Sequence, residues 1–165
     1  MRNDGLRAIG IAALLALLGS PVFAQTATTS FNVSLTITAE CKIISASDLN
    51  FGSVGVISNN IDVNSAIVVQ CTNNTGYFLG LSAGLGTGAT VATRRMTGGT
   101  PSGTVDYSLY TTAARSTVWG DTGSARQSGM GNGGNQSYVV YGRIAPQTTP
   151  APGGYTDTIT VTLTY

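Results

Sequence analysis

The sequence predicts an all-β protein built as an antiparallel β-sandwich. Short runs in which apolar and polar residues alternate recur along the chain, and this two-residue period is typical of strands with one buried face. Clusters rich in Gly, Asn, Ser and Pro separate these runs, and 22 of the 165 residues are glycine. Only 9% of the residues are charged, and no helical periodicity follows residue 24. Together these features favour a sandwich of short strands.

The first 24 residues are typical of an export signal. Arg2 and Arg7 precede the apolar stretch 8–18, and Val22-Phe23-Ala24 supplies the small-residue pattern of a cleavage site. This stretch is too short for a membrane span, which needs about 20 residues, so stable membrane insertion is not expected. The sequence therefore predicts an exported chain of residues 25–165, with room for one domain.

Charge and composition exclude several classes of function. The full chain has 8 basic and 7 acidic residues, and removing Arg2, Arg7 and Asp4 leaves 6 of each. A neutral surface offers no basic field for nucleic acid. The chain contains no histidine, the commonest general base and metal ligand. We therefore expect no enzyme, no metal site and no cofactor.

Cys41 and Cys71 are the only two cysteines. An even pair in an exported protein is most simply a structural disulfide, and its spacing fits no metal motif. Closing a loop of this length is expected to stabilise the fold by about 3–4 kcal/mol on the chain-entropy argument.

Alternation predicts six strands in order along the chain. In each run the apolar residues fall on every second position, so they share one face of the strand. The runs are marked by Phe31, Val33, Leu35 and Ile37; by Ile61, Val63, Ile67, Val69 and Cys71; by Tyr77, Leu79 and Leu81; by Val105, Tyr107 and Leu109; by Tyr138, Val140, Gly142 and Ile144; and by Ile159, Val161, Leu163 and Tyr165.

Two low-complexity segments, 83–93 and 120–135, are predicted to be loops.

Two motifs resemble catalytic or cofactor-binding signatures, but the features that such sites need are missing. Gly80-Leu81-Ser82-Ala83-Gly84 resembles the elbow of serine hydrolases, but no histidine is present to accept the serine proton. The glycine pattern at 129–134 opens no predicted helix, so it is not a dinucleotide fingerprint.

Several side chains are candidates for surface roles. Arg94-Arg95 is interpreted as part of a solvated strand face, and the scattered acids as turn residues. Most aromatic residues fall in phase with the strands and are expected to pack there. Trp119 is the one candidate for an exposed contact, and it leaves open a carbohydrate-binding function.

Both ends of the exported chain alternate as strands, although terminal segments are commonly frayed and polar. If the sandwich lacked one strand, its last strand would border an open groove, and a segment from a second copy could enter it by strand addition. Burying the four apolar residues of the N-terminal segment would contribute about 6–12 kcal/mol. A head-to-tail contact of this kind builds a filament. The candidate donor residues are Phe31, Val33, Leu35 and Ile37.

Several short motifs follow one another along the exported chain. They are Asp48-Leu49-Asn50-Phe51-Gly52, Arg95-Met96, Asp106-Tyr107-Ser108-Leu109-Tyr110, Trp119-Gly120, Val140-Tyr141-Gly142-Arg143-Ile144 and the stretch from Gly154-Tyr155-Thr156-Asp157 to Thr162. Their order, together with the export signal and the cysteine pair, resembles the spore coat protein U domain, a family that includes the pilin subunits of archaic chaperone-usher pili. The resemblance covers nearly the whole exported chain.

This resemblance implies an incomplete immunoglobulin-like sandwich that is completed by donor-strand exchange. Residues 25–37 would be the donor segment, overlapping the first core strand, and residues 38–165 the pilin domain. The acceptor groove, which a chaperone would also contact, would be flanked by the strand containing Ile159, Val161, Leu163 and Tyr165. The implied partners are other copies or sibling pilins, a periplasmic chaperone and an outer-membrane usher.

The sequence therefore favours a structural subunit of a surface pilus or fimbria, exported through the periplasm, that supports adhesion and biofilm formation. Two alternatives remain open at this point. One is a carbohydrate-binding or adhesin module that uses Trp119. The other is a coat protein assembled on a spore or cell surface by the same physics.

Overall fold

The computed structural model describes residues 23–99 and 101–165. Contacts along the chain group it into two units, residues 1–35 and 36–165. The predicted export signal, residues 1–24, lies almost entirely outside the described residues. Within the described part, no helix is long and apolar enough to cross a membrane.

Residues 23–35, the described part of the first unit, form no helix or strand. Phe31, Val33 and Leu35 are 86%, 86% and 85% exposed, and Ile37, at the start of the second unit, is 76% exposed. The expectation of a core strand at 31–37 is therefore wrong for this chain taken alone. Alternation shows that a segment has one apolar face, but a strand also needs a neighbouring backbone to pair with.

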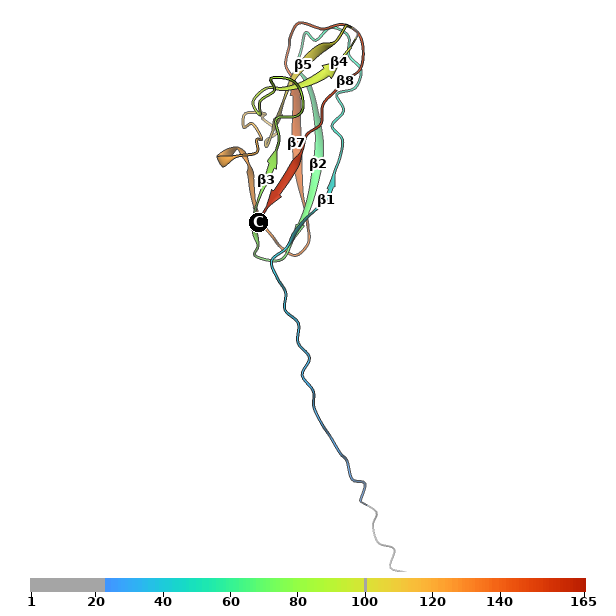
Figure 1. The fold of residues 1–165 in the computed structure, drawn as a ribbon, viewed down its shortest axis with the longest axis vertical. Helices are drawn as coiled ribbons and strands as arrows, with labels where there is room; N and C mark the ends of the chain where they lie inside the picture. Colours follow the sequence, from blue (N-terminus) through green and yellow to red (C-terminus); the bar gives the residue numbers. More distant parts are fainter. Residues whose placement is uncertain (1–22, 100) are drawn as a thin grey trace, which may run out of the picture. The chain divides into compact units, whose positions relative to one another are not determined.

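The larger of two antiparallel sheets has six strands (Figure 1). Their order across the sheet is β1-β2-β7-β5-β4-β8, so β1 and β8 are its edges. The longest strand pair is β2 with β7, with Ile61 opposite Ile144 and Gln70 opposite Asn135. The strands span Cys41–Ala46 (β1), Ile61–Cys71 (β2), Arg94–Gly98 (β4), Gly103–Tyr110 (β5), Asn135–Ile144 (β7) and Tyr155–Thr156 (β8).

The smaller sheet has the order β6-β3-β9, from Gln127–Met130 (β6), Gly76–Leu81 (β3) and Val161–Thr164 (β9). A short 3₁₀ helix, η1, spans Gly123–Ala125. Both η1 and β6 lie in the segment 120–135 that was expected to be a loop. The expectation is wrong for Gln127–Met130, because these residues pair antiparallel with β3 although they lie in a glycine-rich segment.

The hydrophobic core lies between the two sheets and takes alternate residues from each. Tyr77, Leu79 and Leu81 of β3 are at most 2% exposed, and Val69 of β2 is fully buried. This alternation confirms the predicted faces of β2, β3, β5 and β7 and gives the all-β, antiparallel, immunoglobulin-like sandwich. The other buried apolar residues include Ile67, Val105, Tyr107, Leu109, Val140 and Ile144.

The predicted disulfide is confirmed. Cys41 and Cys71 are bonded and lie opposite each other where β1 pairs with β2, with 4.1 Å between their Cα atoms. The bond therefore ties the first residue of an edge strand to the last residue of a central strand. Further along, the register of β1 shifts between Ile43 and Ser45, a bulge that bends this edge.

Arg94 does not lie on a solvated face, so that part of the sequence interpretation is wrong. The side chain is fully buried, and its hydrogen bonds go to four backbone carbonyl groups. Burial lowers the pKa of this guanidinium from its ordinary value. Its five N–H donors fit several carbonyls at once, which explains how a charge is accommodated without a carboxylate on those atoms. Arg95 does face outward and pairs with Asp106 at 2.8 Å.

Candidate strand-acceptor groove

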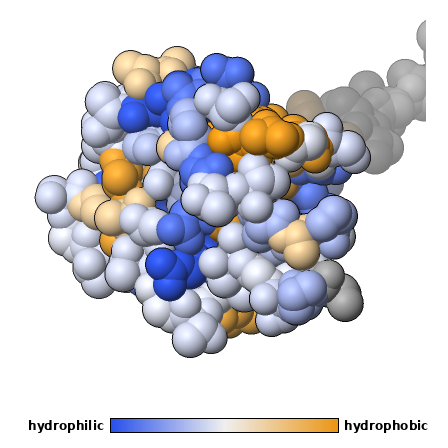
Figure 2. Space-filling view, turned by 90° about the horizontal axis from the view of Figure 1, so that it is seen from above, coloured by the Kyte–Doolittle hydropathy of each residue, from blue (hydrophilic) through white to orange (hydrophobic). Residues whose placement is uncertain are grey.

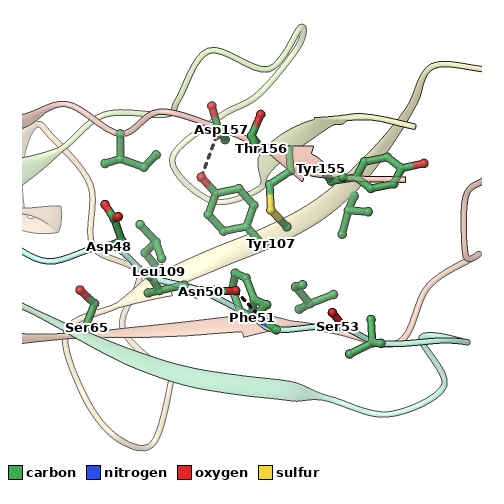
Figure 3. A pocket seen from close by; sticks show the side chains of 18 of the residues that line it. Asp48, Asn50, Phe51, Ser53, Ser65, Tyr107, Leu109, Tyr155, Thr156 and Asp157 are labelled. Atoms are coloured by element: carbon green, nitrogen blue, oxygen red, sulfur yellow. Dashed lines mark hydrogen bonds between the residues drawn. The ribbon is translucent and has the colours of Figure 1, made fainter. Parts of the chain in front are cut away.

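An apolar groove of about 1200 Å³ opens between two walls of the sandwich. One wall is the segment 46–57 that follows β1, and the other is the segment 153–161 that leads through β8 into β9. The floor is core: Leu81, Val105, Leu109, Val140 and Ile144 all face it. Figure 3 shows side chains of both walls and the floor converging on this space.

The first wall carries no strand between residues 47 and 60. Leu49 and Phe51 are half-buried and pack against the core, whereas Val54 and Val56 are 52% and 80% exposed. The Asn50 side chain accepts a hydrogen bond from the backbone of Gly52 at 2.8 Å. This wall thus packs on the core through Leu49 and Phe51, while the side chains of Val54 and Val56 stay open to solvent. Seen from the end where β4, β5 and β8 lie, apolar side chains form separate patches on a mostly polar surface (Figure 2).

Gly142 lies directly beneath the Leu49 and Phe51 side chains of this wall. A Cβ atom on Gly142 would lie 2.8 Å from Leu49 Cδ1 and 3.1 Å from Phe51 Cζ, closer than ordinary packing allows. Gly142 of β7 therefore provides the space in which both side chains sit. This also explains why a glycine falls in phase with the apolar face of that strand.

We expect Gly142→Ala to destabilise the domain by about 2 kcal/mol and to displace the wall that holds Leu49 and Phe51, because overpacking forces neighbouring groups to move. Urea unfolding checks this prediction. Gly76→Ala is a matched control in another strand, where an added Cβ meets nothing within 4 Å. Equal effects of the two substitutions would contradict it.

The second wall crosses from one sheet to the other. β8 pairs with β4 of the larger sheet and β9 pairs with β3 of the smaller sheet, and residues 157–160 between them belong to no strand. Ile159 and Val161 are half-buried and line the groove. Backbone edges without a strand neighbour are templates for strand addition.

The predicted acceptor residues are therefore only partly brought together at the groove. Ile159 and Val161 line it, while Leu163 packs against the core from β9 without lining it. Tyr165 is 60% exposed. Alternation placed all four residues on one face, but only Ile159 and Val161 of them line the groove, because a local pattern gives no information on where the opposite wall ends.

Tyr107 of β5 lies on the floor of the groove and connects its two walls. Its hydroxyl donates to Asp157 Oδ2 at 2.7 Å on one side (Figure 3). On the other side its ring meets that of Phe51 edge-on, with centroids 6.1 Å apart. Burial, followed by the hydrogen bond to Asp157, raises the pKa of this hydroxyl well above its ordinary value, so it remains a donor. Sequence reasoning placed Tyr107 in a strand and Asp157 in a turn, but assigned neither to a site.

Trp119 is not an exposed contact, so this prediction is wrong. The side chain is 1% exposed, and its indole N–H donates to the backbone carbonyl of Leu79 at 2.9 Å. The backbone N–H of Trp119 donates to the backbone carbonyl of Leu109. Trp119 therefore spans the core from sheet to sheet, and it offers no surface for a sugar ring.

The matches with known proteins agree with this architecture. Residues 27–162 match the Spore Coat Protein U domain. The chain belongs to this family. One relative is Protein U of Myxococcus xanthus, which is 30% identical over an alignment of 159 residues; the match covers 88% of this chain and 89% of that protein.

A solved structure is also similar to this spore coat U domain: the crystal structure of the CsuC–CsuE chaperone–tip adhesion subunit pre-assembly complex from archaic chaperone-usher Csu pili of Acinetobacter baumannii. The TM-score is 0.58 and the sequence identity 27%, over 79% of this chain and 41% of the matched chain. The spore coat U domain described here thus spans less than half of that chain. The family assignment from the short motifs is confirmed, and so is the pilin-like fold.

Proposed function

We propose that this protein is a structural subunit of a surface pilus or fimbria that polymerises head-to-tail by donor-strand complementation. The observation that carries the proposal is an apolar groove that opens onto the core of a sandwich, in a chain whose N-terminal segment exposes an alternating apolar face. Phe31, Val33, Leu35 and Ile37 of one copy would enter the groove of the next copy.

The chemistry of the two parts is complementary. Residues 25–39 carry no charged side chain, and the floor of the groove is formed mainly by aliphatic residues, with Tyr107 among them. The four donor side chains would leave water, and the donor backbone would pair with the free edge of the wall at 157–161. The donor and the groove are different surfaces of one chain, so the contact repeats without closing, and the product is a filament.

An open apolar groove is a hazard for an isolated subunit, because exposed strand edges and apolar floors promote aggregation. We propose that a periplasmic chaperone covers the groove before assembly and that an outer-membrane usher exchanges it for the donor segment. The similarity to a subunit solved in a chaperone pre-assembly complex supports the chaperone. The filament would lie on the cell surface and support adhesion and biofilm formation.

A coat of a spore or cell surface is a second candidate, favoured by the similarity to Protein U of Myxococcus xanthus. It would use the same strand addition and differ only in location. Immunogold imaging distinguishes the two, since a pilus subunit labels filaments that extend from the cell and a coat subunit labels a continuous layer.

The proposal is tested by placing two charges on each face of the donor segment in turn. Val33→Asp with Leu35→Asp puts carboxylates on the apolar face, where the groove would have to bury them, so polymerisation is expected to be lost. Asn32→Asp with Ser34→Asp adds the same charges to the alternate face and is the matched control, expected to polymerise. Unboiled gel ladders and electron microscopy report the polymers.

A second experiment mixes the variant that cannot donate with the unmodified chain. The Val33→Asp, Leu35→Asp chain keeps an intact groove but cannot donate, so adding it to the unmodified chain is expected to shorten the polymers. Donor-strand complementation is wrong if this variant still polymerises alone, or if both pairs of charges reduce assembly equally.

A further inference from the structure

The groove wall at residues 157–160 has little support from its own backbone. Within this stretch, the backbone bonds to the rest of the domain are both made at Thr160. Its N–H donates to Ser82 Oγ at 2.9 Å, and its carbonyl accepts from the Ser82 N–H at 3.0 Å. The beginning of the wall must be held by side chains.

Asp157 supplies that support. Its Oδ2 accepts the Tyr107 hydroxyl at 2.7 Å. Its Oδ1 accepts the backbone N–H groups of Leu85 at 2.7 Å and Thr158 at 2.8 Å. The turn next to it is shaped for the carboxylate: Gly84 has φ +87°, and any Cβ there would overlap Asp157. Three donors from three parts of the chain thus converge on one carboxylate.

Tyr107 connects the hydrogen bonds of Asp157 to the floor of the groove. Its side chain is 6% exposed and stands on the floor, between Phe51 of the first wall and Asp157 of the second. Figure 3 shows Tyr107 between these two side chains. The hydroxyl reaches a carboxylate, and hydrogen bonds to charged acceptors are stronger than those between neutral groups. The position of the second wall is therefore tied to the floor.

We propose that Tyr107 and Asp157 are positioning residues for strand uptake, which hold the wall at 157–160 in its receptive arrangement before a donor strand arrives. This inference rests on the proposed function. A site that is formed in only a fraction of the molecules binds more weakly by that fraction, so a preformed wall raises the affinity without touching the donor's side chains. Tyr107 and Asp157 would act on the wall of the groove, so that the groove is formed before the donor strand binds.

The test measures binding of a fluorescent peptide of residues 27–38 to the full exported chain carrying Val33→Asp and Leu35→Asp, which leaves the groove vacant. Tyr107→Phe removes the hydroxyl and keeps the ring on Phe51. We expect the dissociation constant to rise about 10-fold, a factor in keeping with one hydrogen bond to a charged group. The loss should appear in the association rate constant, with the dissociation rate nearly unchanged, because fewer molecules present a formed wall.

Asp157→Ala and the double variant test whether the two residues act together. Asp157→Ala is expected to weaken peptide binding at least as much as Tyr107→Phe, and adding Tyr107→Phe to it should change little further, since the Tyr107 hydroxyl has already lost its acceptor. Asp157→Asn keeps an acceptor for Leu85 and can donate to the Tyr107 hydroxyl, so it should restore much of the rate. Additive losses would overturn the inference.

Tyr77→Phe is the control for a loss of stability alone. Tyr77 is 2% exposed and its hydroxyl bonds to that of Tyr138 at 2.7 Å, but it does not line the groove. This variant should lower the urea midpoint without altering peptide association. Folding of every variant is checked by the fluorescence of buried Trp119. If Tyr107→Phe and Tyr77→Phe slow association equally, the positioning role is wrong. If the parent chain binds no peptide, the proposed function itself fails.

Discussion

A chain that carries a second copy of residues 27–38 after Tyr165, joined by a turn of about four residues, is expected to be a soluble monomer. It should exceed the unmodified chain in stability by about 4 kcal/mol. Burial of the four apolar side chains and new backbone hydrogen bonds to the groove wall favour the closed form, and ordering the added segment opposes them. For a domain of this size, the melting temperature should rise by roughly 10 °C.

Calorimetry and sedimentation measure the two outcomes. The matched control appends a peptide of the same composition in which Phe31, Val33, Leu35 and Ile37 no longer alternate with polar residues. It adds equal length and hydrophobicity without a one-sided apolar face, so it should bring no stability. If the control peptide stabilises the chain as much as the natural order does, the groove does not recognise the alternating pattern of a donor strand.

Substituting Arg94 by Ala is expected to destabilise the donor-extended monomer by about 3–5 kcal/mol, the largest loss for any single polar side chain. The substitution removes hydrogen bonds to the carbonyls of Leu81, Ser82, Val91 and Trp119. The carbonyls of Leu81 and Trp119 would remain buried without a donor, and such groups are costly. Arg94→Lys should retain only part of the stability that Arg94→Ala loses, since one ammonium group cannot reach four carbonyls as a guanidinium does.

The adjacent Arg95→Ala is the control, because it removes the same charge from the next position. Arg95 is paired with Asp106 in a solvated setting, and exposed ion pairs contribute at most about 1 kcal/mol. Urea unfolding of both variants is the measurement. A loss of similar size at positions 94 and 95 would contradict the role assigned to the buried guanidinium.

Strands with a strict two-residue period were predictable from the sequence. β2, β3, β5 and β7 lie where alternation indicated, and their buried residues are those on the apolar face. β1 was missed because a bulge between Ile43 and Ser45 interrupts its period. β8 has only two residues and is too short to carry a pattern.

Two core residues could not be placed from the sequence because their partners are distant backbone groups. Arg94 bonds to carbonyls up to 25 positions away, and Trp119 to the carbonyl of Leu79, 40 positions away. A charged residue in a strand is usually solvated, and a lone tryptophan among loop residues suggests exposure. Nothing in local pattern signals a carbonyl that another strand will bring near.

The candidate site was predictable in part for the same reason. The donor face and the wall with Ile159 and Val161 follow from alternation, which is local. The opposite wall with Leu49 and Phe51, and the link from Tyr107 to Asp157, depend on packing across the sandwich. Their residues lie in the motifs that carried the family resemblance, but the motifs gave no indication of contact.

The disulfide lies where the N-terminal segment enters the folded domain, four positions after Ile37. In a filament of the proposed kind, a pull on one subunit reaches the next along that segment and meets the sandwich first at Cys41. The sulfur bridge passes this tension directly to the end of β2, the interior strand next to β1 in the larger sheet. The edge strand β1 is thereby spared from being peeled away under load.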